Sequence, residues 1–305
     1  MKLLVVGHLC KDVVHSRDGQ ERETWGGVAN AVATLGALAG KDDTIVPICG
    51  VGPDDDGVFR AWLGRVPAVM TDGVFASGGP TNRIHIFEQD DGARTVCTRE
   101  VAAPIPFERI RRFLAGDGLL ISMASGADIT LETLDQIRME VRPRGTPIHL
   151  DLHNLTMGVA ANGDRFRRPL PDWRRWAFML TSVQMNEEEI AGLAIERLNE
   201  DQTVGHLLTL GVKGVIVTRG QRGATLYTSA HKEIVRNDIA PVPSSVPGSP
   251  TGLGDVFSAA YLFECVSSGD MVRAAAFAAR IAGEAAERQA GVRSTNPMED
   301  DRSAP

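Results

Sequence analysis

The sequence predicts an α/β protein, in which a mostly parallel sheet lies between layers of helices and a small β-sheet is attached. Short apolar segments rich in β-branched residues alternate with segments of helical periodicity, a pattern typical of parallel strands joined by crossover helices. One segment departs from this alternation and contains two strand-like stretches joined by a short turn. The chain has 305 residues, 43% hydrophobic and 23% charged, which suits a soluble globular protein of one large domain or one and a half.

The main sheet and its helices are expected at regular intervals along the chain. Strands are predicted at residues 3–6, 44–48, 119–122, 148–150, 178–181 and 215–218. Helices are predicted at residues 29–38, 57–63, 131–141, 187–193, 255–266 and 270–289.

The segment that departs from the alternation lies between Thr81 and Glu100. Its two strand-like halves are joined at residues 89–92, where an Asp-Gly step favours a tight hairpin turn. We expect this hairpin and the polar stretch 13–24 to form a lid; an ordinary surface hairpin is the alternative. The expected division is a core of residues 1–12, 25–73 and 101–293, a β lid of residues 13–24 and 74–100, and a flexible tail of residues 294–305.

Charge and cysteine content narrow the classes of function. The formal net charge is −7, which gives no general attraction to nucleic acid or to anionic membranes. The chain has no apolar run long enough for a membrane span and no basic leader before its first strand. The four cysteines form no C-x-x-C pair, so neither a zinc site nor a disulfide framework is indicated, and we expect a cytoplasmic protein.

The most informative segment is Ser249 to Glu264, which reads SPTGLGDVFSAAYLFE. Gly252 and Gly254 lie in a loop that opens an apolar helix, where free backbone N–H groups and the helix dipole favour an anion. A carboxylate at the same place, Asp255, would repel an anion unless it takes a proton from a hydroxyl that attacks a phosphoryl group. The alternative is a plain helix cap with turn glycines.

A second polar group follows a predicted strand, in the segment QMNEEEIAGL. Asn186 and Glu189 fall where that strand ends and a helix begins, the edge at which α/β proteins bind ligands. Their oxygen atoms suit a hydrated magnesium ion. The alternative is an N-capped helix with an acidic first turn.

Two further glycine-containing turns are candidate ligand contacts. The segment VIVTRGQRGATLY places Thr218, Gly220 and Gly223 in a turn that can pass beneath a nucleotide, or that simply closes a β-hairpin. Near the N-terminus, Asp12 follows the first strand and the Gly26-Gly27 pair precedes an Ala-rich helix. These residues could bind a substrate hydroxyl. Alternatively, Asp12 only caps a turn, and the glycine pair only allows tight packing of the helix.

Other well-known catalytic motifs are missing from the sequence. No G-x-G-x-x-G follows the first strand, so the dinucleotide-binding fingerprint is absent. No H-E-x-x-H or G-x-S-x-G occurs, which removes the usual signatures of zinc proteases and α/β-hydrolases.

The order of these segments resembles the PfkB family of carbohydrate kinases, which have the ribokinase-like fold. The resemblance covers about Lys2 to Arg293, and TGLGDVFSAAY is its most specific part. It implies a three-layer α/β/α core with a mostly parallel sheet and a small β lid. It also implies transfer of the γ-phosphate of ATP, with Mg²⁺, to a hydroxyl of a sugar or a sugar-like polyol.

The resemblance also implies roles for individual residues. Asp255 matches the general base, and Gly252, Leu253 and Gly254 match the anion hole. Asn186 and Glu189 match the magnesium-associated motif. The nucleotide site is expected to contain Thr218, Gly220, Gly223, Thr251, Gly252 and Gly254. The acceptor site is expected to contain Asp12, Gly26, Gly27 and Asn30.

Departures from the family pattern fall mostly on the acceptor side. Asn30 comes one residue early after the glycine pair, and Cys10 stands where ribokinases have a ribose-contacting asparagine, so ribose is disfavoured and an inositol-like polyol is suggested. Ser249 replaces an aspartate, which leaves activation by a monovalent cation open. A nucleoside kinase, or a non-catalytic protein that binds ATP or sugar, is the alternative function. We expect no nucleic-acid or membrane partner, and the family implies a possible homodimer through the lid.

Overall fold

The computed structural model describes residues 1–16, 19–88, 94–231, 233–242 and 252–291. Several expectations concern residues outside these ranges: the hairpin turn at 89–92, Ser249, Thr251 and the tail at 294–305.

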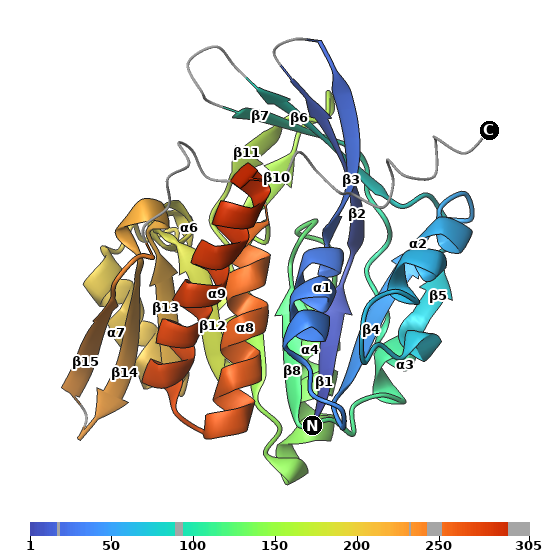
Figure 1. The fold of residues 1–305 in the computed structure, drawn as a ribbon. Coiled ribbons are helices and arrows are strands. Elements are labelled where there is room, and N and C mark those ends of the chain that lie inside the picture. The colour runs from blue at the N-terminus through green and yellow to red at the C-terminus, as the bar shows by residue number, and fades with distance from the viewer. Residues whose placement is uncertain (17–18, 89–93, 232, 243–251, 292–305) are drawn as a thin grey trace.

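A nine-stranded sheet runs through the centre of the molecule (Figure 1). Its strands pair in a parallel manner, except that β14 and β15 form antiparallel pairs at one edge. The order is β15 (Glu233–Ile239), β14 (Ala224–Ala230), β13 (Gly214–Thr218), β12 (Ser182–Asn186), β9 (Ile148–Asp151), β8 (Gly118–Ser122), β1 (Lys2–Gly7), β4 (Thr44–Val51) and β5 (Val74–Ala76). The predicted α/β class with a mostly parallel sheet is thus confirmed.

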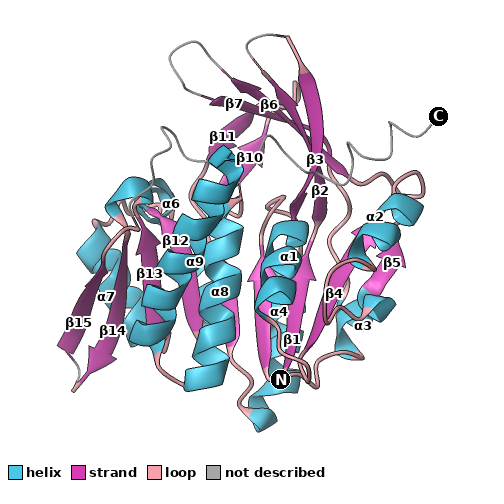
Figure 2. Cartoon of the chain, viewed as in Figure 1, coloured by secondary structure: helices cyan, strands magenta, loops and turns pink. Residues whose placement is uncertain are grey.

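Helices cover both faces of this sheet, because its central strands are apolar on both sides. In β1, Leu3 and Val5 face one layer while Leu4 and Val6 face the other, and all four are fully buried. The first layer contains α1 (Val28–Leu38), α2 (Asp56–Leu63), α8 (Leu253–Ser268) and α9 (Met271–Gly291). The second contains α3 (Phe107–Arg111), α4 (Leu131–Val141), α5 (Trp173–Phe178), α6 (Glu187–Gly192) and α7 (Glu200–Thr209) (Figure 2).

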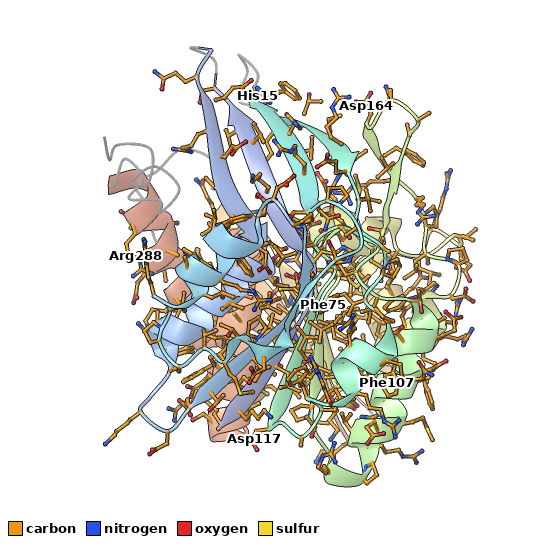
Figure 3. All side chains as sticks on the ribbon, turned by 90° about the vertical axis from the view of Figure 1, so that its right-hand side faces the viewer. His15, Phe75, Phe107, Asp117, Asp164 and Arg288 are labelled. Carbon is orange, nitrogen blue, oxygen red and sulfur yellow. The ribbon has the colours of Figure 1, made fainter. Side chains whose placement is uncertain are left out.

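A separate four-stranded sheet stands at one end of the core, with the order β3 (Glu21–Gly27), β2 (Leu9–His15), β6 (Asn82–Glu88) and β7 (Arg94–Glu100). The hairpin of β10 (Met157–Val159) and β11 (Arg165–Arg167) touches it through a bridge between Cys97 and Asp164. In Figure 3, His15 and Asp164 mark this end of the molecule and Asp117 marks the opposite end.

The structure corrects several expected boundaries. The predicted strand at 178–181 is wrong: Trp173, Trp176 and Ala177 are buried on one side of helix α5, and the strand begins only at Ser182. Residues 74–76, expected in the lid, form β5 of the main sheet. The stretch 13–24 contains parts of two paired strands, and β2 already begins at Leu9. The division into a core and a moving lid remains a proposal.

Candidate active site

The candidate residues gather where the parallel strands end. Gly7 of β1 pairs with Ser122 of β8, and Ser122 pairs with Asp151 of β9. Further along the same sheet, Asn186 of β12 pairs with Thr218 of β13. Because carboxyl ends of parallel strands share one edge, the sheet register itself brings polar side chains from distant segments into one row.

Asp255 lies in the first turn of α8, which begins directly after Gly252, and its side chain is only 4% exposed. Asn30 of α1 donates from Nδ2 to Asp255 Oδ2 at 3.0 Å, and Ser122 Oγ lies 3.5 Å from Oδ1. Burial raises the pKa of this carboxyl, while the nearby His153 imidazole and the two hydrogen-bonding side chains lower it. Asp255 is therefore a carboxylate held in place by hydrogen bonds and able to take up a proton.

The loop that leads into α8 requires glycine at position 252. Gly252 has φ 85°, in the left-handed region. A Cβ atom there would lie 2.5 Å from Asn30 Nδ2, the same nitrogen that binds Asp255. Leu253 and Gly254 lie in the first turn of the helix, where backbone N–H groups lack acceptors within the helix and can bind an anion.

The acceptor-side residues come together between the small sheet and the core. Asp12 lies on β2, and a Cβ at Gly26 of the neighbouring β3 would be 2.2 Å from Asp12 Oδ2. A Cβ at Gly27 would be 2.3 Å from the carbonyl oxygen of His8. Both glycines are thus needed for close approach, and Gly26 lets the Asp12 carboxyl lie flat against the backbone.

Burial and the charge of Asp255 raise the pKa of Asp12 to about 7, against the lowering effect of His153 and Arg165. Its ordinary pKa is 3.8. Between these two values the folded protein holds a proton that the unfolded chain lacks, so this residue makes stability fall as the pH rises from about 4 to about 7.

We therefore expect the isosteric Asp12→Asn variant to gain stability relative to the wild type as the pH rises. The difference should grow by on the order of 1 kcal/mol per pH unit within this window. Urea unfolding at pH 4.5, 6 and 7.5 measures it. Some slope will remain in the variant, because burial also raises the pKa of Asp151 to about 7. A wild type and variant whose unfolding free energies run parallel with pH would contradict the assignment.

Asn186 and Glu189 form a capping box at the start of α6. Asn186 Oδ1 accepts from the Glu189 backbone N–H at 2.8 Å, and Glu189 Oε2 accepts from the Asn186 N–H at 2.8 Å. The structure thus realises the capped-helix alternative at these two residues. Their part in a metal site stays a prediction, and in the described part of the chain no three histidine, cysteine or acidic side chains are close enough to chelate a metal.

The site nevertheless has buried carboxyl groups of the kind that can hold a hydrated cation. Glu189 and Asp151 are both buried. The charges of Asp255 and Glu189 add to the effect of burial and raise the pKa of Asp151. Magnesium keeps several waters, so it can be held through them by such carboxylates and by the phosphates of a donor.

The turn with Thr218, Gly220 and Gly223 follows β13, beside Asn186. Gly220 and Gly223 have φ of 57° and 85°, and a Cβ at Gly223 would lie 2.1 Å from the carbonyl oxygen of Ile239. The turn is anchored by Arg219, which is hydrogen-bonded to Glu187 of α6, Glu200 of α7 and Thr225 of β14.

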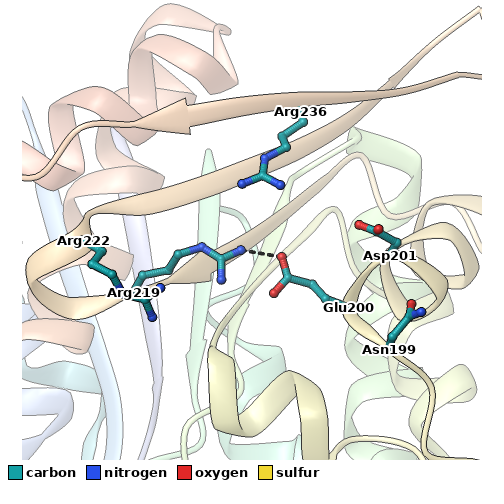
Figure 4. A pocket seen from close by; sticks show the side chains of 6 residues that line it. All are labelled: Asn199, Glu200, Asp201, Arg219, Arg222 and Arg236. Atoms are coloured by element: carbon teal, nitrogen blue, oxygen red, sulfur yellow. Dashed lines mark hydrogen bonds and ion pairs between the residues drawn. The ribbon is translucent and has the colours of Figure 1, made fainter.

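An open depression of about 450 Å³ borders this turn. Its lining residues are Asn199, Glu200, Asp201, Arg219, Arg222 and Arg236 (Figure 4). It flanks the turn, and its lining does not include Asp255.

Sequence reasoning missed three residues at the site. Asp151 ends β9 and is 3% exposed, and its buried Oδ2 has no hydrogen-bond partner among the residues that the structure describes. His153 has φ 42°, an unusual conformation for histidine, and its pKa is raised by Asp255, Asp151 and Glu189 in spite of its burial. Arg165 reaches the site from the β10–β11 hairpin. The segment LDLHNL at a strand end is the sequence signal for the first two residues. Arg165 begins a basic run that extends to Arg175, but the sequence alone does not connect that run with the site.

Comparisons with known proteins agree with this geometry. A family model described as pfkB family carbohydrate kinase matches residues 161–298. A cytidine kinase of Thermococcus kodakarensis is 25% identical over 269 residues, covering 86% of this chain and 87% of the relative.

Two solved structures illustrate the likeness in fold. A ribokinase of Thermotoga maritima superposes with a TM-score of 0.74 at 20% identity, covering 99% of each chain. A pyrophosphate-dependent kinase in the ribokinase family, complexed with a pyrophosphate analog and myo-inositol, superposes with a TM-score of 0.73 at 17% identity, covering 93% of this chain and 94% of that one.

The resemblance inferred from the motifs is therefore confirmed. The fold is ribokinase-like over nearly the whole chain, and residues 161–298, which contain the segment from Asn186 to Asp255, match the PfkB family of carbohydrate kinases. Among the described helices, none has both the length and the apolar character needed to span a bilayer.

Proposed function

We propose that the protein is an ATP-dependent kinase that transfers the γ-phosphate to a hydroxyl of a small sugar or sugar-like polyol. The observation that carries this proposal is the position of Asp255. It is a buried carboxylate, fixed by Asn30 and Ser122, in the first turn of a helix whose first N–H groups can bind an anion. An anion-binding helix end with a carboxylate in its first turn suits phosphoryl transfer, in which a base must lie beside the phosphate.

Each group then has a role in the reaction. Asp12 accepts a hydrogen bond from one acceptor hydroxyl, while Asp255 takes the proton of the hydroxyl that attacks. The new bond joins that oxygen to the γ-phosphorus, the bond to the β-phosphate oxygen breaks, and ADP leaves. The N–H groups of Leu253 and Gly254 and the dipole of α8 stabilise the charge on the transferred group. Thr218, Gly220 and Gly223 lie beneath the donor, and we place Thr251 with them.

Asn186 and Glu189, with Asp151, would hold the hydrated Mg²⁺, which neutralises donor phosphate charge when bound. We expect excess chelator to abolish turnover and added magnesium to restore it. ADP release measured with and without chelator checks this, and thermal unfolding of the protein alone controls for damage to the fold. Undiminished turnover in chelator would contradict a magnesium requirement.

A coupled ADP-release screen over pentoses, hexoses, inositols, sugar acids and nucleosides tests the function directly. A parallel arm measures orthophosphate release with pyrophosphate as donor, because one similar structure is a pyrophosphate-dependent kinase. Acceptor-dependent ADP release would support the proposal. Binding of ATP or sugar in thermal-shift measurements, without turnover of any acceptor, would instead support a non-catalytic binding protein.

A nucleoside kinase is the second candidate function. The similarity to a cytidine kinase over 86% of the chain favours it. Preference for nucleosides over every sugar and polyol in the same screen would decide for this candidate. A cytoplasmic location and a homodimer through the small sheet remain proposals, the second open to light scattering.

A further inference from the structure

Arg165 is a largely buried cation without a counter-ion among the described residues. Its Nε donates to Thr98 Oγ1 at 2.7 Å. Its Nη2 is buried and has no hydrogen-bond partner within the described part of the chain. No carboxylate of the described residues lies within the 4.0 Å that defines an ion pair with this side chain. A buried charged donor left in this way is unfavourable unless a ligand supplies the missing acceptor.

The register of the small sheet places this guanidinium group at the acceptor site. Thr98 pairs with Ile84, and Ile84 pairs with Asp12, so the three side chains share one face of the sheet. Thr98 and Asp12 are two strands apart, which corresponds to about 10 Å. Arg165, in contact with Thr98, therefore lies at one side of this face of the small sheet, and Asp12 lies at the other side. Consistently, the charge of Arg165 lowers the pKa values of Asp12, Cys10 and His153.

The acidic groups that act on the pKa of Arg165, Asp12 and Asp128, do not neutralise it. Asp128 acts on its pKa from a distance, but both Asp128 oxygens already accept hydrogen bonds, from His8, Ser125 and Gly126. Asp12 has a pKa of about 7 and so carries only part of a charge near neutrality. Arginine is the residue best suited to bind carboxylate or phosphate in a buried site, because its planar fork offers parallel donors.

We propose that Arg165 binds an anionic group of the acceptor, a carboxylate or a phosphate, while Asp12 binds one of its hydroxyls. This inference rests on the proposed kinase function and narrows its substrate class to acidic polyhydroxylated molecules. Sugar acids and sugar phosphates share the required chemistry.

Thermal-shift titration tests the inference without relying on turnover. The ligands form matched pairs: D-gluconate against D-sorbitol, and D-fructose 6-phosphate against D-fructose. The wild type should bind the anionic member of at least one pair about tenfold or more tightly than the neutral member. Which pair shows the difference distinguishes carboxylate from phosphate. Equal affinities within both pairs, or no shift with either anionic ligand, would overturn the proposal.

Variants at position 165 test whether the Arg165 side chain causes the preference for the anionic ligand. Arg165→Met keeps the length of the stem and removes the charge, so it should lose the preference while its affinity for the neutral ligands stays unchanged. Arg165→Lys should retain part of it, since the charge remains without the fork. Arg168→Met, an exposed position close by on the chain, is the matched control and should behave as wild type. An Arg165→Met protein with the full preference would overturn the proposal.

The same measurements on Asp255→Asn separate this inference from the proposed function. If the anionic preference is present in Asp255→Asn but no acceptor is phosphorylated by the wild type, the kinase function fails and the role of Arg165 stands. If the wild type phosphorylates neutral polyols best and Arg165→Met is unaffected, the kinase function stands and the role of Arg165 fails.

Discussion

The Asp255→Asn variant should lose about 10²- to 10⁴-fold in kcat while it retains ATP binding, because a general base contributes a factor of this size. Asparagine has the shape of aspartate, so its side-chain oxygen can still accept from Asn30 Nδ2, but it cannot take the proton of the attacking hydroxyl. The fold should not suffer, since burial already disfavours the charged form of Asp255. Single-turnover kinetics measure the chemical step, and thermal shift with Mg-ATP measures binding.

Glu264→Gln is the matched control for this variant. Glu264 is a buried carboxyl group on the same helix, α8, and it pairs with Arg273 at the helix end remote from Gly252. We expect the Glu264→Gln variant, which loses the charge that pairs with Arg273, to change in stability and to keep kcat near the wild-type value. An Asp255→Asn protein as active as the wild type would show that another group removes the proton.

The second large effect is expected from Gly252→Ala. The added Cβ would lie 2.5 Å from Asn30 Nδ2, and so displaces the side chain that positions Asp255. We expect kcat to fall about 10²-fold, the size of effect that a misplacement of about 1 Å produces at a reacting group. Stability should fall by about 1–2 kcal/mol as well, because alanine disfavours the left-handed conformation. Steady-state kinetics and urea unfolding measure the two effects.

Gly269→Ala separates conformational strain from the contact with Asn30. Gly269 ends the same helix with φ 71°, and no atom lies within 4 Å of a Cβ built there. It should lose similar stability with no change in kcat. If both variants lost activity equally, general loosening of α8 would explain the result, and the geometric role of Gly252 would be wrong.

These residues also show how far the sequence could predict the site. Asp255 and Gly252 lie within one short segment, where the loop, the helix start and the carboxylate are local features. The bounds of α4 were likewise predicted from its periodicity and are the same in the structure, Leu131–Val141. The order of motifs along the chain was enough to indicate the family. Asn186 and Glu189 were placed at the correct strand end, but the choice between cap and metal ligand depends on side-chain geometry.

The other features of the fold and of the candidate site could be recognised only from the tertiary structure. The apolar residues from Trp173 to Leu180 resemble a strand when read locally, yet they pack as a helix followed by a turn. Arg165 is 153 positions from Asp12 along the chain. Only the pairing of β2, β6 and β7 and the contact of the hairpin with Thr98 bring these two side chains to one face.

The short connection at Gly27 links the small sheet to Asp255, the proposed general base. Strand β3 ends at Gly27, α1 begins at Val28, and Asn30 in the first turn of α1 holds Asp255. Gly27 has φ 61° and ψ −131°. If the small sheet moves as the proposed lid, a rotation at Gly27 would reach Asp255 within a single turn of helix α1. In the proposed kinase, coupling of this kind would make proton abstraction depend on a closed sheet over a bound acceptor, and it would protect ATP from reaction with water.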